Sequence, residues 1–109
     1  MDHPELNPEI IHAFKKGDPE ALTAFSQLFY HSLCYFATQL TGSAAEAEKI
    51  VKDTFEKLWY KHRDFENAEN IKAFLYIATR NASLNFLRHL QVKEASRKKP
   101  EYLENSQGA

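Results

Sequence analysis

The sequence contains little cysteine and glycine, and it has no long run of apolar residues. Its one cysteine, Cys34, has no second cysteine with which to form an internal disulfide or to begin a zinc site. The three glycines lie too far apart to form a phosphate-binding loop. The first nine residues lack the basic and apolar segments of a secretion signal, and no apolar stretch is long enough to cross a membrane. These absences argue against disulfide-stapled, nucleotide-binding, secreted and membrane-spanning proteins.

Recognisable catalytic and metal-binding patterns are missing as well. The five histidines are widely scattered, without a His-Glu-x-x-His pair, and no Gly-x-Ser-x-Gly marks an exposed nucleophile. A small helical enzyme is an alternative with little support, because no nucleophile, base and orienting group stand together in the sequence. We therefore expect a protein that is not an enzyme and that holds no metal and no cofactor.

Apolar residues recur at three- and four-residue steps along most of the chain, which is the pattern of amphipathic helices. Gly17 and Gly42 stand where helices would stop in a left-handed conformation. With 43% hydrophobic residues, the 109-residue chain is expected to form one core. The sequence predicts an all-α fold, a compact bundle of four helices, one short at the N-terminus and three long. These helices are predicted after Asn7, over residues 19–41, from Ser43 to Tyr60 or Lys61, and from Asn67 to about Leu90.

Polar residues are predicted to cap each of these helices. Asn7, Asp18 and Asn67 carry side-chain oxygens that accept hydrogen bonds from free backbone N–H groups in the first turn. Ser43 and Glu46 are predicted to form a capping box, in which the hydroxyl and the carboxylate each accept a backbone hydrogen bond. The helix boundaries follow from these positions.

The third predicted helix has an apolar face and a charged face. Cys34, in the second predicted helix, and Trp59, in the third, are predicted to pack in the core. The apolar face consists of Ala47, Ile50, Val51, Thr54, Phe55 and Leu58. The charged, exposed face consists of Lys49, Lys52, Asp53, Glu56 and Lys57.

Charge is distributed unevenly along the chain. Residues 1–69 carry seven basic and twelve acidic side chains, a balance of −5, whereas residues 70–109 carry seven basic and three acidic ones, a balance of +4. The second part suggests an anionic partner, with a solvated basic tail as the alternative. Residues 93–109 lack core positions and are predicted to be a basic or polar linker after a helical domain of residues 1–92.

The polar face of the fourth predicted helix combines arginines, amides and an aromatic ring. Arginine neutralises phosphates, amide side chains bind base edges and aromatic rings stack on unpaired bases. This combination favours single-stranded nucleic acid, although a solvated surface has the same composition. The face consists of Tyr76, Arg80, Asn81, Ser83, Asn85, Arg88 and Gln91.

Three segments resemble extracytoplasmic-function sigma factors of bacterial RNA polymerase. Residues 47–59 (AEKIVKDTFEKLW) are similar to region 2.2 of that family, and residues 71–81 (IKAFLYIATRN) with 85–88 (NFLR) are similar to regions 2.3 and 2.4. Residues 25–30 (FSQLFY), with Leu33, Phe36 and Ala37, are similar to region 2.1. The resemblance covers about residues 10–92 and implies a sigma region 2-like domain.

The resemblance implies two contact surfaces. Core RNA polymerase would be bound through the clamp helices of its largest catalytic subunit, and the minus-ten element would be bound as single-stranded promoter DNA. The polymerase-binding residues would be Lys49, Lys52, Asp53, Glu56 and Lys57, although the family usually has an acid and a glutamine where this chain has Lys49 and Lys52. The DNA-binding residues would be Tyr76, Arg80, Asn81, Asn85 and Arg88, together with His62, Arg63 and Phe65 in a loop that pockets a flipped base.

The implied function is promoter melting in the cytoplasm without ATP, through capture of the non-template strand. An anti-sigma factor is a further implied partner. Complete family members carry a second domain that reads the minus-thirty-five element, so this chain is expected to be an isolated or truncated domain. The alternative from the residues alone is a helical protein-interaction module, such as an adaptor.

Overall fold

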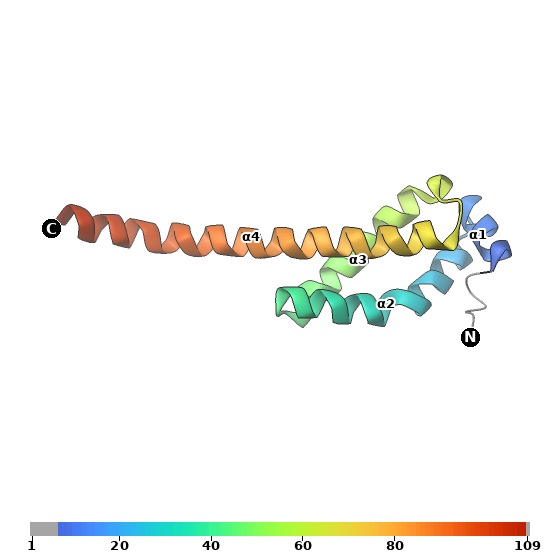
Figure 1. Ribbon diagram of the computed structural model, residues 1–109, viewed down its shortest axis with the longest axis horizontal. Coiled ribbons are helices and arrows are strands. Elements are labelled where there is room, and N and C mark those ends of the chain that lie inside the picture. Colours follow the sequence, from blue (N-terminus) through green and yellow to red (C-terminus); the bar gives the residue numbers. More distant parts are fainter. Residues whose placement is uncertain (1–6, 109) are drawn as a thin grey trace.

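The computed structural model describes the backbone of residues 7–108 and the side chains of residues 7–96. Its α-helices are α1 (Pro8–Lys15), α2 (Pro19–Thr41), α3 (Ala44–Tyr60) and α4 (Ala68–Gly108), with a short 3-10 turn, η2 (His62–Asp64), after α3. Helices α2, α3 and the first part of α4 pack on one another, while α1 covers one end (Figure 1). No strand occurs within residues 7–108, and the predicted all-α four-helix bundle is confirmed.

The predicted caps explain where three helices begin. The Asn7 side chain accepts a hydrogen bond from the Ile10 amide at 2.9 Å, and Asp18 accepts one from Glu20 at 3.0 Å. Asn67 caps α4 through the amide of Asn70, also at 2.9 Å. These contacts satisfy backbone donors that have no partner inside the helix.

The predicted capping box of α3 is only half formed. Ser43 Oγ accepts from the Glu46 amide at 3.1 Å, as predicted. The Ser43 amide, however, donates to Thr41 Oγ1 at 3.1 Å, so it does not need the Glu46 carboxylate. That carboxylate instead lies 4.0 Å from the Lys49 ammonium. The turn before α3 is thus stabilised by a threonine that the sequence pattern does not reveal.

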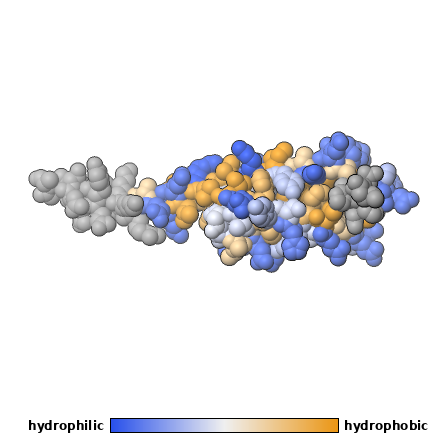
Figure 2. All heavy atoms as spheres, turned by 60° about the horizontal axis from the view of Figure 1, so that its bottom comes forward, coloured by the Kyte–Doolittle hydropathy of each residue, from blue (hydrophilic) through white to orange (hydrophobic). Residues whose placement is uncertain are grey.

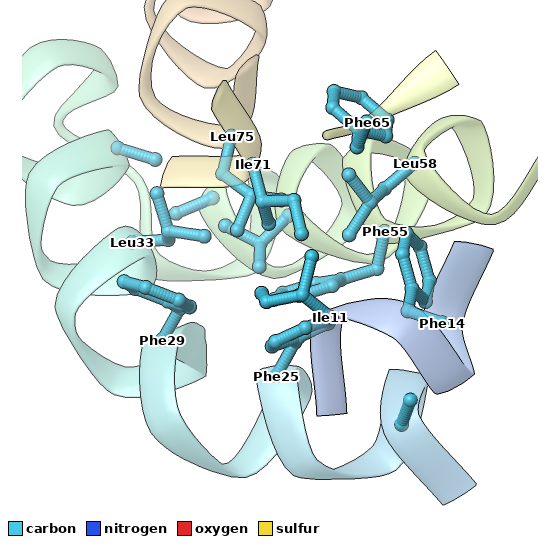
Figure 3. Close-up of a cluster of buried hydrophobic side chains, with 14 residues drawn as sticks. Ile11, Phe14, Phe25, Phe29, Leu33, Phe55, Leu58, Phe65, Ile71 and Leu75 are labelled. Atoms are coloured by element: carbon cyan, nitrogen blue, oxygen red, sulfur yellow. The ribbon is translucent and has the colours of Figure 1, made fainter. Parts of the chain in front are cut away.

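All four helices contribute to one hydrophobic core (Figure 3). Phe14 and Phe25 are fully buried and pack edge to face, with ring centroids 5.1 Å apart. Trp59 lies 6.1 Å from Phe14 and packs on the core as predicted. The predicted apolar face of α3 is buried throughout, and its predicted charged face is exposed throughout.

Two expectations differ from the structure. Helix α4 does not end near Leu90 but continues to Gly108, beyond the bundle (Figure 1). The helix formers Lys93, Glu94 and Ala95 extend it, and no glycine follows Gly42 until Gly108. Cys34 is only partly buried, although burial still raises the pKa of its thiol. Within the described part of the chain, no helix has both the length and the apolar character needed to span a bilayer.

Candidate nucleic-acid interface

A groove of about 680 Å³ runs along α4 and reaches α3. It brings together four of the predicted DNA-binding residues, all of them exposed. The small side chains of Ala78 and Ala82 form part of its wall and leave space for a ligand. The groove is lined by Lys57, Ala78, Arg80, Asn81, Ala82, Leu84, Asn85 and Arg88.

Helical spacing explains why these side chains meet. Residues three and four positions apart lie on the same side of a helix, so Asn81, Asn85 and Arg88 form one ridge. Arg80 reaches this ridge from the neighbouring side, where its guanidinium donates a 3.5 Å hydrogen bond to the Asn81 side-chain oxygen. The amides and cations therefore face a common space that suits a chain of bases and phosphates.

The groove is electrostatically positive. Lys57, Arg80 and Arg88 lie on it, and none of the residues that line it is acidic among those that the structure describes. The closest carboxylate to Lys57 is that of Asp53, at 3.1 Å and exposed to solvent. Exposed pairs of this kind contribute little free energy, so Lys57 remains available to an anionic ligand.

The position of Lys57 in the groove was not predicted from the sequence. The pattern along α3 grouped it with the charged, polymerase-facing side, whereas the structure places it in the groove beside α4. Its place depends on how α3 packs against α4, and the helical period of α3 alone carries no information about that packing. Leu84 also lines the groove and was not predicted to do so.

Two residues of the predicted polar face lie elsewhere. Tyr76 is partly buried and packs on Phe36 of α2, with ring centroids 5.4 Å apart. Ser83 was predicted on the polar face, but it is fully buried, as is Thr79 one turn earlier. Neither hydroxyl has a hydrogen-bond partner among the described residues. The polar surface of α4 is therefore narrower than the sequence suggested.

The loop between α3 and α4 is fixed by contacts with α1. His62 stacks on Trp59 with ring centroids 5.1 Å apart, and its Nδ1 donates to the Lys15 carbonyl at 2.9 Å. Lys15 also pairs with Glu66 at 2.6 Å. These contacts tie the loop to α1.

The predicted base-contacting residues of this loop are placed differently from one another. Phe65 is buried in the core, with its ring 6.3 Å from Phe14 and 5.4 Å from Phe74, so its predicted contact with DNA does not fit its position. His62 is half-buried against Trp59. Arg63 is exposed and can reach a ligand.

The other predicted surface is the outer face of α3. Lys49, Lys52, Asp53 and Glu56 are all exposed and recur at three- and four-residue steps on one side of the helix. Charges of both signs occur there, in contrast to the positive groove on α4. The two surfaces adjoin at the Asp53–Lys57 pair.

Comparison with known families gives one match. The family model for Sigma-70 region 2 matches residues 26–92, more than half of the chain, and its match includes every residue that lines the groove. No curated protein and no solved structure matches.

Proposed function

Because the chain belongs to the Sigma-70 region 2 family, whose non-enzymatic members bind core RNA polymerase and promoter DNA, we propose that it is the promoter-melting domain of an extracytoplasmic-function sigma factor. The observation that carries this proposal is the positive groove in which Arg80, Asn81 and Arg88 come together with Lys57. The groove would hold the non-template strand of the minus-ten element.

Each kind of side chain in the groove has a separate task in this proposal. The cations neutralise phosphates and release counterions, which gives affinity without sequence preference. Asn81 and Asn85 bind base edges and supply the preference. Unstacking a base costs a few kcal/mol, and these contacts offset that cost once the strand is separated. No ATP is required, because capture of the unpaired non-template strand itself stabilises the melted form of the promoter.

We assign the exposed face of α3 to the clamp helices of the polymerase's largest catalytic subunit. Lys49, Lys52, Asp53 and Glu56 offer both signs of charge there, which gives specificity more than affinity. Lys57 is assigned to the DNA groove, because it lies on that groove. The two partners would then bind adjoining surfaces without competing.

A protein partner is a second candidate, favoured by apolar residues at the surface of α4. Leu90 and Val92 are 43% and 59% exposed, and Figure 2 shows hydrophobic atoms where α4 leaves the bundle. We propose that an anti-sigma factor covers this surface and restricts access to the neighbouring groove. Such a partner would regulate DNA binding by this domain. This second candidate therefore adds to the proposed DNA-binding function and does not replace it.

The proposal is tested by fluorescence anisotropy with pools of single-stranded, minus-ten-like oligonucleotides at low salt, with duplex DNA for comparison. Arg80→Ala should weaken binding to all sequences and lower the salt dependence by about one counterion. Asn81→Ala should reduce the preference among sequences, by about 1–3 kcal/mol if the amide makes two hydrogen bonds to a base. Circular dichroism checks that both variants remain helical.

Lys49→Ala is the matched control, because it removes one exposed positive charge from the polymerase-facing surface. It should leave oligonucleotide binding unchanged and weaken binding to core RNA polymerase, whereas Arg80→Ala should do the reverse. If the wild-type domain binds no pool, or if both α4 variants bind as well as the wild type, the groove is not the DNA site.

A further inference from the structure

A second groove, of about 500 Å³, lies between α2 and α4 on the side of α4 that carries Tyr76. Three aromatic rings line it, from Tyr35, Phe36 and Tyr76. Tyr35 is 69% exposed, so its ring adds little to the stability of the bundle. The aromatic groove, as we name it, is lined by His31, Ser32, Tyr35, Phe36, Gln39 and Tyr76.

The chemistry of the aromatic groove suits an unpaired base. The rings of Phe36 and Tyr76 pack together, with centroids 5.4 Å apart and an angle of 59° between their planes, and form the apolar base of the groove. The ring of Tyr35 lies beside them and is largely exposed to solvent. Gln39 and Ser32 offer hydrogen-bond donors and acceptors at the rim. No acidic side chain lines the groove in the described part of the chain, so nothing there repels a phosphate.

The aromatic groove and the positive groove reach α4 at neighbouring positions, although no residue lines both. Tyr76 lines the first and Arg80 lines the second, and they are four residues apart on α4, which is about 6 Å along the axis. Successive nucleotides of one strand are about 3.4 Å apart even when stacked, and farther apart when extended. One strand can therefore pass from one groove to the other within one or two nucleotides.

We propose that the aromatic groove holds one further unstacked base of the bound strand, with Tyr35 and Tyr76 as its stacking surfaces and Gln39 at its edge. This inference rests on the proposed function, because the strand must first lie in the positive groove. It adds α2 to a DNA surface that otherwise consists of α4, Lys57 of α3 and the loop after α3. Tyr35 and Gln39 thereby become candidates for setting promoter preference at one position.

The test is a length series of single-stranded oligonucleotides bound to the full 109-residue chain. Starting from the shortest oligonucleotide that binds, one nucleotide is added at either end, and binding is followed by fluorescence anisotropy. One particular addition should raise the affinity of the wild type roughly tenfold, as expected for one stacked base. Tyr35→Leu should lose this gain while binding the shortest oligonucleotide normally, and Tyr35→Trp should keep it.

Tyr60→Leu is the matched control, because Tyr60 is an even more exposed tyrosine, on α3 and outside both grooves. It should behave as the wild type at every length. If no oligonucleotide of any length binds the wild type, the proposed function itself fails. If the shortest one binds but no addition gives a gain that depends on Tyr35, only the aromatic groove is excluded.

A third outcome also overturns this inference. In this outcome, Tyr35→Leu leaves the whole length series unchanged and weakens binding to core RNA polymerase instead. The aromatic groove would then be a protein contact, and the DNA surface would end at Arg80.

Discussion

The two ends of the bundle are built from different side chains. At the end covered by α1, large aromatic rings such as those of Phe14, Phe25 and Phe65 pack against one another between the helices (Figure 3). Toward the turn at Gly42, where α4 leaves the bundle, the buried positions are small or hydroxylated instead. They include Ala37, Thr41, Ala47, Thr79 and Ser83.

This difference indicates where the fold obtains its stability. Burying a large ring removes much more apolar surface from water than burying an alanine or a serine does, so the α1 end dominates the stability of the domain. Small residues at the other end allow the backbones of α2, α3 and α4 to approach one another closely. The large buried rings are thus concentrated at the α1 end, whereas most of the proposed DNA groove on α4 lies toward the other end.

The largest expected effect comes from breaking the aromatic end. Phe14→Ala removes a fully buried ring that contacts Phe25, Trp59 and Phe65, and it should lower the free energy of unfolding by about 3–5 kcal/mol. Urea unfolding followed by circular dichroism measures this change. Tyr60→Ala, which truncates an exposed ring, should cost less than about 0.5 kcal/mol. Similar losses in the two variants would contradict the idea of a dominant aromatic end.

Sequence periodicity was sufficient to predict most of this architecture. The faces of α3, the caps at Asn7, Asp18 and Asn67, and the glycines at the helix ends depend on residues close together in the chain. Each of these local patterns has one favourable structure, and the structure agrees with the prediction. The half-formed capping box is an exception, because Thr41 competes with Glu46 for the same amide.

The candidate site was predicted less completely, because it depends on how the helices pack. Arg80, Asn81, Asn85 and Arg88 share one helix, and their common face follows from their spacing. Lys57 joins them only through the contact of α3 with α4, while Phe65 turns inward because α1 supplies an aromatic partner for it. A serine at position 83 looks polar in sequence, and only the packing of α4 shows that it is buried.

Each end of the bundle has one glycine at which a helix stops, Gly17 at the α1 end and Gly42 at the other. Gly17 and Gly42 both have positive φ, at 94° and 73°, so alanine is strained at either position. At Gly17 the added Cβ would also lie 3.2 Å from His62 Cε1, whereas at Gly42 nothing lies within 4 Å. Gly17→Ala should therefore cost about 2 kcal/mol and Gly42→Ala about 1 kcal/mol, by the strain of a left-handed residue.

Urea unfolding of both glycine variants measures this difference. Gly17→Ala should also expose His62 by disturbing its hydrogen bond to the Lys15 carbonyl, which is visible in the nuclear magnetic resonance signals of the imidazole. An equal loss in the two variants would mean that His62 moves aside freely. The α1 end would then be less rigid than its ring contacts indicate.

The smallest expected effect has the opposite sign and belongs to the end where α4 leaves the bundle. Thr79→Val keeps the shape of the side chain but removes a buried hydroxyl that has no hydrogen-bond partner among the described residues, so it should raise the free energy of unfolding by about 1 kcal/mol. Thr54→Val is the matched control, since the buried Thr54 hydroxyl donates to the Ile50 carbonyl at 2.8 Å. It should be neutral or destabilising by up to about 1 kcal/mol. If only Thr79→Val stabilises the protein and oligonucleotide binding is unchanged, the Thr79 hydroxyl contributes neither to folding nor to DNA binding. If Thr79→Val instead loses oligonucleotide binding, the Thr79 hydroxyl is needed for DNA binding by α4.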